Sequence, residues 1–480
     1  MTNTLTATAI AQNLIGGEWT GTADFERNNP ARPGQTASVA PSSSLETLSD
    51  AISAASAAQA KWAALPMPAR GAILMAAGEI LRNRRDTVAA DLVREEGKTI
   101  AEATGEVNRA IDVLRFFGSL GWAASGEVLP SGLSGTSIHT RREPLGVVGL
   151  ITPWNFPIAI PAWKMAPALL AGNSVVIKPA ELTPMSATHL ALALMDAGLP
   201  EGVLNVVHGK GRVVGDALAK DRRVAALSFT GSTNVGLGLH RTLSERRARV
   251  QLEMGGKNGV LVLDDASPRA AAQVVASGGF GLTGQACTAT SRVYATPGIY
   301  TALLEELSGI ARTFVPGDGL DPATTMGVVV SEQQLATDLA AIEGAAGRGG
   351  RVMQGGRSNG QALEATVITD VPYDDAVVTE EIFGPVVAVL EVPDYESGLA
   401  QINDSSYGLT AGICTDSLSR STDFTERAQA GVVKVNRPTA GLDLNVPFGG
   451  IKDSSTNTFR EQGHTALEFF SWGKTIYTGI

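Results

Sequence analysis

The sequence predicts an α/β protein with more than one domain, and three observations carry this prediction. Its 480 residues exceed what a single hydrophobic core normally holds, so two or three domains are expected. From Leu145 onward, short apolar runs alternate with helix-like stretches, a pattern typical of parallel strands joined by crossover helices. Hydrophobic residues make up 44% of the chain and charged residues 18%, an ordinary balance for a globular protein.

The elements of a first unit follow from hydrophobic periodicity. Helices with apolar residues at helical spacing are expected over Thr47 to Ala64, Ala69 to Arg85 and Thr87 to Gly118. Strands are then expected at Val147 to Ile151, Ser174 to Ile177, Leu204 to Val207 and Ala225 to Phe229. The helices between them are expected at Ile160 to Ala171, Pro184 to Ala197, Val213 to Lys220 and Val235 to Leu243. Because these strands are continuous apolar runs, both faces of their sheet should be buried.

A second unit begins after Gln251. Strands are expected at Gly259 to Leu263, Val293 to Ala295, Val386 to Val392 and Gly431 to Asn436, with a helix at Ala270 to Gly279. The stretches Gly135 to Pro144 and Ala466 to Tyr477 fit neither core. Pairing across a subunit interface and a local hairpin are both compatible with their pattern.

Charge, cysteines and histidines narrow the function. The net charge of −10 is not offset by a long basic run, so we expect no nucleic-acid partner. Two cysteines exclude a disulfide framework and fit a reducing compartment. Neither a signal peptide nor an apolar run near the roughly 18 residues of a membrane helix is present, so we expect a cytoplasmic protein without a membrane partner. The five histidines lack ligand spacing, so no metal site is expected.

Cys287 is the first candidate for chemistry. It lies in the segment 284–288 (GQACT), where small residues let the backbone approach a bound carbonyl closely. A thiolate is a strong nucleophile and leaves readily from a thioester. A free cysteine is more often an inert buried side chain, so both interpretations stay open from this segment alone. Cys414 lies in an apolar stretch and is expected to be structural.

Two polar residues near the ends of expected strands are further candidates. Glu253 ends a strand-like run before two glycines, where a carboxylate facing a cavity would activate water; a capping role is equally compatible. Asn155 lies in the turn 152–157 (TPWNFP) that follows a buried strand, and its side-chain N–H would stabilise an oxyanion. Trp154 and Phe156 in the same turn are also compatible with core anchors.

Three loops suggest a bound dinucleotide. Lys178 to Glu181 follows a strand, where an acidic residue holds ribose hydroxyls in such folds. The segment from Phe229 to Ser232 opens a helix and would admit a phosphate to the helix N-terminus. The segment 209–215 (GKGRVVG) nearly matches the dinucleotide fingerprint but has one residue too many before its third glycine.

In combination these segments resemble the aldehyde dehydrogenase superfamily, from about residue 14 to the end. The motifs that carry the resemblance are PWNFP at 153–157, KPAE at 178–181, FTGS at 229–232, EMGGKN at 253–258, GQAC at 284–287, EEIFGP at 380–385 and PFGG at 447–450. The resemblance implies a Rossmann-like cofactor domain at 1–122 and 145–252, an α/β catalytic domain at 253–455, and a small β oligomerisation arm at 123–144 and 456–480. It also implies a homodimer or homotetramer.

The resemblance assigns roles position by position. Cys287 matches the nucleophile, Asn155 and the Cys287 backbone N–H match the oxyanion hole, and Glu253 matches the base that activates water for thioester hydrolysis. Lys178 and Glu181 match the adenosine-ribose site, and Lys178 is also placed among the catalytic residues. Further implied cofactor contacts are Thr152, Trp154, Gly211, Gly215, Phe229, Gly231, Ser232, Glu381 and Phe383. NAD or NADP is the implied cofactor, and Glu181 favours NAD because it would repel a 2′-phosphate.

The substrate is less well defined. The segments 434–441 (KVNRPTAG), 448–455 (FGGIKDSS) and 460–463 (REQG) resemble bacterial 2,5-dioxopentanoate dehydrogenases, which act in sugar-acid catabolism. Some semialdehyde-oxidising members carry an arginine in the helix after the Asn-Phe-Pro turn, but this chain has Trp163 there. Arg115, Trp163 and Arg437 are therefore hypotheses for substrate binding. Succinic semialdehyde, an aliphatic or aromatic aldehyde, and thiol esterase or acyl-transfer chemistry without a redox step stay open as alternatives.

Overall fold

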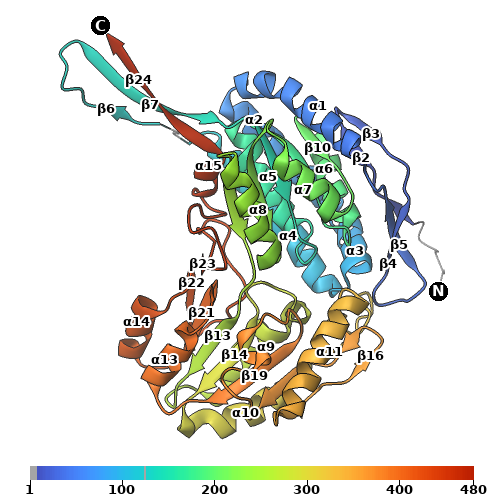
Figure 1. The fold of residues 1–480 in the computed structure, drawn as a ribbon, viewed down its shortest axis with the longest axis vertical. Helices are drawn as coiled ribbons and strands as arrows, with labels where there is room; N and C mark the ends of the chain where they lie inside the picture. The colour runs from blue at the N-terminus through green and yellow to red at the C-terminus, as the bar shows by residue number, and fades with distance from the viewer. Residues whose placement is uncertain (1–7, 124–125, 480) are drawn as a thin grey trace.

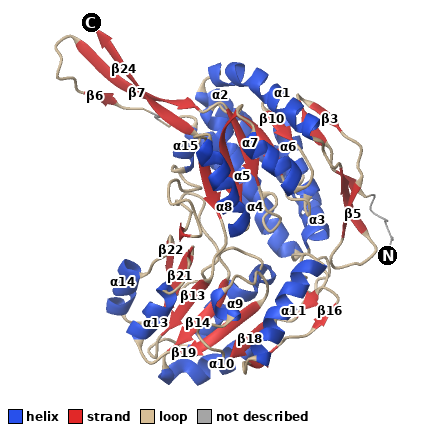
Figure 2. Ribbon diagram, in the orientation of Figure 1, coloured by secondary structure: helices blue, strands red, loops and turns tan. Residues whose placement is uncertain are grey.

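The computed structural model describes residues 8–123 and 126–479 and consists of two α/β lobes with a projecting β arm (Figure 1). Each lobe is built on one seven-stranded sheet. In both lobes helices lie on both sides of the strands, so the sheets are buried in the way their apolar sequences require (Figure 2). The expected domains include residues 1–7, 124–125 and 480, which lie outside the described residues.

The sheet of the first lobe has the strand order β12-β11-β8-β9-β10-β2-β3. The five strands from β12 to β10 are parallel, and β2 and β3 extend the sheet in antiparallel fashion. Their bounds are β2 Asn13–Ile15, β3 Glu18–Thr20, β8 Val147–Ile151, β9 Ser174–Lys178, β10 Leu204–Val206, β11 Val224–Thr230 and β12 Arg249–Glu253. A small sheet of β1 Ala9–Ile10, β5 Thr36–Ala40 and β4 Phe25–Asn28 lies beside it. The four strands expected between residues 147 and 229 are confirmed within one residue at each end.

The helices of this lobe are α1 Leu45–Ala64, α2 Met67–Asn83, α3 Arg85–Glu96, α4 Ile100–Leu120, α5 Ala159–Ala171, α6 Pro184–Asp196, η1 Gly211–Gly215, α7 Asp216–Lys220 and α8 Thr233–Glu245. The single helical stretch expected from Thr87 to Gly118 is wrong, because it is broken between α3 and α4. Gly97 ends α3 with a φ of 98°, a backbone conformation that favours glycine, and Thr99 caps α4 in a capping box with Glu102. The periodicity is helical on both sides of this break, so hydrophobic spacing did not locate it.

The sheet of the second lobe has the order β15-β18-β19-β14-β13-β21-β22. Only β15, at one edge, runs antiparallel to its neighbour. The strands are β13 Asn258–Val262, β14 Thr290–Ala295, β15 Arg351–Gln354, β18 Thr366–Thr369, β19 Val386–Glu391, β21 Thr410–Cys414 and β22 Val432–Val435, with short pairs β16 Ser358–Asn359 and β17 Ala362–Leu363, and β20 Tyr407–Gly408 and β23 Ile451–Lys452. The helices are α9 Pro268–Phe280, η2 Gly281–Gly284, α10 Pro297–Ala311, α11 Glu332–Gly347, α12 Ala376–Thr379, α13 Tyr395–Asn403 and α14 Leu418–Arg427.

The arm is a three-stranded sheet of β24 Ser471–Gly479, β7 Thr136–Pro144 and β6 Val128–Leu129. β24 and β7 pair along their whole length, from Ser471 opposite Pro144 to Gly479 opposite Thr136. The two stretches that fitted neither core therefore pair with each other within the chain. The helix α15 Ala466–Phe469 comes just before β24, and Phe469 and Phe470 lie in the core of the first lobe, so the C-terminal strand of the arm starts only at Ser471.

Candidate active site

The loop that carries Cys287 is held in an unusual backbone conformation. Leu282 and Thr283 have φ values of 55° and 57°, and Gly284 follows with 65°. A Cβ at Gly284 would collide with the carbonyl of Gly384, so this close approach requires glycine. Glu102 at the start of α4 accepts the N–H of Leu282 at 2.7 Å, which ties the loop to the first lobe. Cys287 itself is half-buried.

Two side chains that sequence reasoning missed fix the backbone around Cys287. Asn258, the first residue of β13, donates through Nδ2 to the carbonyls of Cys287 at 2.7 Å and Ala289 at 2.9 Å. Thr439 donates to the carbonyl of Thr288 at 2.7 Å. The only signal for Asn258 in the sequence was its position five residues after Glu253. A buried amide beside reactive groups needs several hydrogen-bond partners. Both contacts immobilise the nucleophile's backbone.

Asn155 lies directly against the same loop. Its Nδ2 donates to the carbonyl of Gln285 at 3.0 Å, so the turn after β8 and the nucleophile loop are in contact. A primary amide has two N–H groups, so Asn155 keeps a second donor beside Cys287. Asn155 is buried, and its main-chain carbonyl accepts a hydrogen bond from Lys98 Nζ at 2.8 Å.

The Lys98 cluster, which we define as Lys98, Glu96 and Glu106, holds the turn in place. Lys98 Nζ is 2.7 Å from Glu106 Oε2 and 3.8 Å from Glu96 Oε2. Glu106 also accepts the N–H groups of Ile158 and Ala159 at the start of α5. The cluster therefore braces the turn at Asn155 and the start of α5 that follows it. Sequence reasoning missed it, because charges within a helical stretch are usually solvated.

Glu253 ends β12 and points into a buried group of charges. We call this group the Glu253 cluster: Glu253, Glu461, Lys164 and Ser228. Lys164 Nζ pairs with Glu461 and donates to Ser228 Oγ at 2.7 Å. One carboxylate oxygen of Glu253 and one of Glu461 have no partner among the described residues. Burial, reinforced by the charge of Glu461, raises the pKa of Glu253 well above its ordinary value.

Burial also raises the pKa of the Cys287 thiol above its ordinary value, and the carboxylates of Glu381, Glu253 and Glu461 add to this effect. The thiol is therefore protonated at neutral pH in the free protein. A base that accepts this proton is needed before Cys287 attacks a carbonyl.

A cleft of about 930 Å³ opens at the carboxyl ends of β8, β9 and β11, where α/β folds bind ligands. Predicted cofactor residues that line it are Thr152, Trp154, Lys178, Glu181, Gly211, Gly215, Phe229, Gly231 and Ser232. Ser331 and Gln333, next to and within α11, line it from the second lobe. The cleft thus brings together all but two of the residues expected to contact a cofactor.

The residues of the cleft fit a dinucleotide. Among the described residues, the buried hydroxyls of Thr152 and Thr230 have no hydrogen-bond partner, which leaves polar groups for a ligand near the N-terminus of α8. Glu181 Oε1 accepts the N–H of Gly211 at 2.8 Å and lies 3.8 Å from Lys178 Nζ. Burial lowers the pKa of Lys178, an effect that Glu181 opposes.

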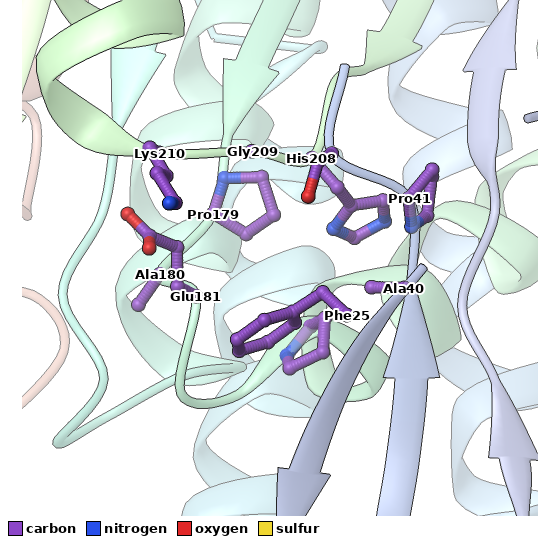
Figure 3. A pocket seen from close by; sticks show the side chains of 11 residues that line it. Phe25, Ala40, Pro41, Pro179, Ala180, Glu181, His208, Gly209 and Lys210 are labelled. Carbon is purple, nitrogen blue, oxygen red and sulfur yellow. The ribbon is translucent and has the colours of Figure 1, made fainter. Parts of the chain in front are cut away.

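A small pocket of about 20 Å³ lies behind Glu181, between Phe25, Pro179, His208 and Lys210 (Figure 3). Lys210 and Glu181 lie at the same end of this pocket (Figure 3). Burial lowers the pKa of His208 to about 4, so its ring is neutral at physiological pH. The pocket closes the wall of the cleft at the position expected for the adenosine ribose.

Glu381 and Phe383, the remaining predicted cofactor residues, lie in the loop before β19. Glu381 Oε1 accepts the N–H of Gly256 at 2.9 Å, and burial raises the pKa of Glu381 to about 7. Phe383 has a φ of 66°, and its ring packs edge-on against Trp154 with centroids 5.4 Å apart. The loop is therefore packed against the cleft wall at Trp154 and against the backbone that follows Glu253.

The residues proposed for substrate binding do not converge. Arg115 pairs with Glu79 on the surface between α2 and α4, through Nε at 3.0 Å. Arg437 is exposed in the loop after β22. Trp163 is half-buried in α5, its ring centroid is 6.2 Å from that of Phe448, and its Nε1 has no partner among the described residues. Trp163 is linked to the Glu253 cluster through Phe448, which pairs with Glu461 by main-chain hydrogen bonds.

Two structural features are absent from the described part of the chain. No group of three or more His, Cys, Asp or Glu side chains there is arranged to hold a metal ion. No helix there is both long and apolar enough to cross a membrane.

Comparison with known proteins agrees with the geometry. Residues 19–476 match the model of the aldehyde dehydrogenase family. The chain is 44% identical to the alpha-ketoglutarate semialdehyde dehydrogenase of Haloferax volcanii, over 97% of this chain and 98% of that protein. It is also 44% identical to the 2,5-dioxopentanoate dehydrogenase of Saccharolobus solfataricus, over 90% and 92% of the two chains.

Solved structures show the same fold. An E. coli NADP-dependent enzyme superposes with a TM-score of 0.95 at 34% identity, covering 98% of both chains. An NAD-dependent aldehyde dehydrogenase from Sinorhizobium meliloti gives a TM-score of 0.95 at 31% identity, covering 98% of this chain and 95% of that one. The chain therefore belongs to the aldehyde dehydrogenase family and is an enzyme that oxidises an aldehyde with NAD or NADP as its cofactor.

Proposed function

We propose that the enzyme oxidises 2,5-dioxopentanoate (alpha-ketoglutarate semialdehyde) to 2-oxoglutarate through a thioester on Cys287. The observation that carries the chemistry is the contact between the turn of Asn155 and the loop of Cys287, together with the Glu253 carboxylate, whose charge acts on the thiol and whose Oε2 has no partner among the described residues. The substrate is supported by the two relatives at 44% identity, whose names are those of dehydrogenases for this aldehyde.

The first half of the reaction uses Cys287 and Asn155. Loss of the thiol proton to a nearby carboxylate frees the sulfur to bond to the aldehyde carbon. The carbonyl oxygen becomes an alkoxide, which the free N–H of Asn155 and the backbone N–H of Cys287 stabilise. When bound, NAD or NADP supplies the acceptor for the hydride that leaves this carbon as the thioester forms. The contacts of Asn258 and Thr439 keep the sulfur and the oxyanion donors in fixed positions.

The second half uses Glu253. Its unpartnered oxygen accepts a proton from water, the water oxygen bonds to the thioester carbon, and the carbon–sulfur bond breaks to release the carboxylate. The raised pKa of Glu253 makes it a stronger base than an exposed carboxylate once it is ionised. Lys178 and Glu181 would hold the adenosine ribose, and Glu381 the nicotinamide ribose, of the bound cofactor.

The same proposal covers the organisation of the molecule. We assign cofactor binding to 1–122 and 145–252, catalysis to 253–455, and assembly of a homodimer or homotetramer to the arm within 123–144 and 456–480. Exposed Trp472 and Tyr477 on β24 support an interface there. The two free cysteines support a cytoplasmic location.

An aldehyde panel tests the proposed function. NAD and NADP reduction is followed by absorbance with 2,5-dioxopentanoate, succinic semialdehyde, pentanal and benzaldehyde. We expect the highest kcat/KM with 2,5-dioxopentanoate, and NAD favoured because Glu181 repels a 2′-phosphate. A higher kcat/KM for a neutral aldehyde would contradict the proposed substrate, and Cys287→Ala is the inactive control.

A further inference from the structure

We propose that Arg109, Gln462 and Trp163 form a subsite that binds the carboxylate of the substrate. This inference rests on the proposed function, because only a carboxylated aldehyde would use such a subsite. Arg109 takes the role that the sequence suggested for Arg115 or Arg437, whose side chains lie on the surface.

Arg109 on α4 is half-buried yet has few partners. Its Nη2 donates to Gln462 Oε1 at 2.9 Å, and within residues 8–123 and 126–479 no carboxylate oxygen lies within 4.0 Å of its guanidinium. The buried arginines Arg70 and Arg292 instead donate to several main-chain carbonyls. Arg109 therefore keeps donors for a further acceptor, and a guanidinium binds carboxylates in bidentate fashion.

Two more buried donors lack an acceptor among the described residues, and one of them belongs to Gln462, which Arg109 contacts. Gln462 is only 1% exposed and has a φ of 60°, and its Nε2 has no acceptor among the described residues. The indole Nε1 of Trp163 is likewise buried and without an acceptor. Unpaired buried donors destabilise a protein, so a ligand that supplies acceptors would account for these two donors. A carboxylate has two oxygens and only accepts, which fits donors of this kind.

The contacts of these residues connect them to the reaction centre. Gln462 follows Glu461, and Trp163 precedes Lys164, and the ion pair between Glu461 and Lys164 joins the two segments. The charge of Glu461 acts on the Cys287 thiol. In this proposal, the far end of a short aldehyde bonded to Cys287 reaches the segment that carries Glu461 and Gln462.

Phe448 and Gly449 lie between the proposed subsite and Glu253. Phe448 exchanges two main-chain hydrogen bonds of 2.7 Å with Glu461 and packs its ring near that of Trp163. Gly449 lies against Glu253, where a Cβ would collide with the carboxylate. The donors therefore occur on the wall that also carries the general base, away from the cofactor cleft.

The nearest acidic residues leave the subsite cationic. Asp112 and Asp443 act on Arg109, but both are exposed and lie more than 4.0 Å from it, so water screens their charges. A desolvated carboxylate of the substrate in direct contact would interact with Arg109 more strongly than they do.

The test compares a carboxylated and a neutral aldehyde of the same chain length. Arg109→Met should raise KM for 2,5-dioxopentanoate by about 10- to 100-fold, the usual loss for a charge-assisted hydrogen-bonded pair, with KM for pentanal changed less than about twofold. Trp163→Phe, which removes a single neutral donor, should raise KM for the carboxylated substrate alone by about 3- to 10-fold. Arg115→Met is the matched control on the same helix and should change neither value.

A second measurement keeps the test valid if Arg109→Met does not fold. Glutarate should inhibit pentanal oxidation by the wild type competitively, and Arg109→Lys or Trp163→Phe should weaken this inhibition. Equal changes in KM for both aldehydes, or glutarate inhibition unchanged in every variant, would overturn the subsite and indicate a structural brace. A wild-type enzyme that does not prefer 2,5-dioxopentanoate in the panel would instead overturn the proposed substrate, whatever the variants do.

Discussion

Two buried charge clusters in this molecule have the same ingredients and different partners. Each combines one lysine with two glutamates: Lys98 with Glu96 and Glu106, and Lys164 with Glu461 and Glu253. Among the described residues, no fully buried side-chain oxygen or nitrogen of the Lys98 cluster lacks a hydrogen-bond partner. In the same part of the chain, the Glu253 cluster has two fully buried carboxylate oxygens without one.

The difference separates a structural role from a reactive one. A buried network whose fully buried polar atoms are all hydrogen-bonded resists rearrangement and holds the segments it contacts, here the turn of Asn155. A buried carboxylate with a free lone pair is destabilising unless a ligand or water uses it, so selection for stability alone would not keep it. Hydrogen-bond satisfaction, more than charge or burial, distinguishes the two clusters.

Glu253→Gln should produce the largest effect and break the reactive cluster. Loss of a general base typically lowers the rate by about 10² to 10⁴-fold, so kcat should fall in this range. The first turnover should still release reduced cofactor, because the thioester forms before water attacks, and stopped-flow absorbance would record this burst. Unfolding in urea should show stability equal to or above that of the wild type, since a buried unpartnered carboxylate is removed. A fall in stability without a change in kcat would mean that Glu253 has a structural role instead of a catalytic one.

Lys98→Met should break the structural cluster. Removing one partner of a buried ion pair leaves an uncompensated charge, and the expected loss is about 3–5 kcal/mol in the free energy of unfolding. Urea denaturation followed by tryptophan fluorescence measures it. Lys61→Met on the exposed end of α1 serves as a control and should change stability by less than about 0.5 kcal/mol. A loss as small as that of the control would mean that the cluster does not stabilise the fold.

Asp338→Asn sharpens the comparison with a third buried carboxylate. Asp338 also has an unpartnered oxygen, and burial raises its pKa to about 7 from 3.8. Because the folded state holds this proton more tightly, the wild type should lose stability as pH rises from about 4 through about 7. The asparagine variant lacks this loss and should be more stable than the wild type at pH 8 by roughly 1–4 kcal/mol. Urea unfolding of the wild type and the variant at pH 4.5 and pH 8 measures this difference in the free energy of unfolding. The same difference at both pH values would refute the titration of Asp338.

Glu461→Gln should produce the smallest effect, a shift in pH dependence. The charge of Glu461 raises the pKa of Glu253, so its removal lowers that pKa. The base is then ionised at lower pH, and the acid limb of the kcat–pH profile should move to lower pH by about one unit. Glu426→Gln on the exposed face of α14 should leave the profile in place. A shift of the acid limb to higher pH would contradict this expectation. It would mean that Lys164, which has lost its ion pair, controls the profile.

The sequence predicted the sheets well because their strands are local, continuous apolar runs. Val147–Ile151 is a strand for reasons contained in those five residues, and its place beside β9 follows from the helix between them. The break at Gly97 was missed, because hydrophobic spacing is helical on both sides of it and does not register a left-handed glycine followed by a capping box. Strands β1, β4 and β5 are short, and the pairing of β1 with β5 joins segments that are far apart along the chain.

The sequence by itself determined which residues have reactive chemistry: a thiol between small residues, a carboxylate at a strand end and an amide in a rigid turn. The family resemblance added the cofactor loops, most of which line one cleft. Only the tertiary structure decided which charged side chains support that chemistry. Lys98 and Arg109 carry no local signal, and Asn258 has only its position after Glu253, because their roles depend on hydrogen bonds to residues between 29 and 353 positions away. Periodicity and motifs describe neighbours along the chain, whereas the environment of a buried charge is set by residues that meet only when the chain folds.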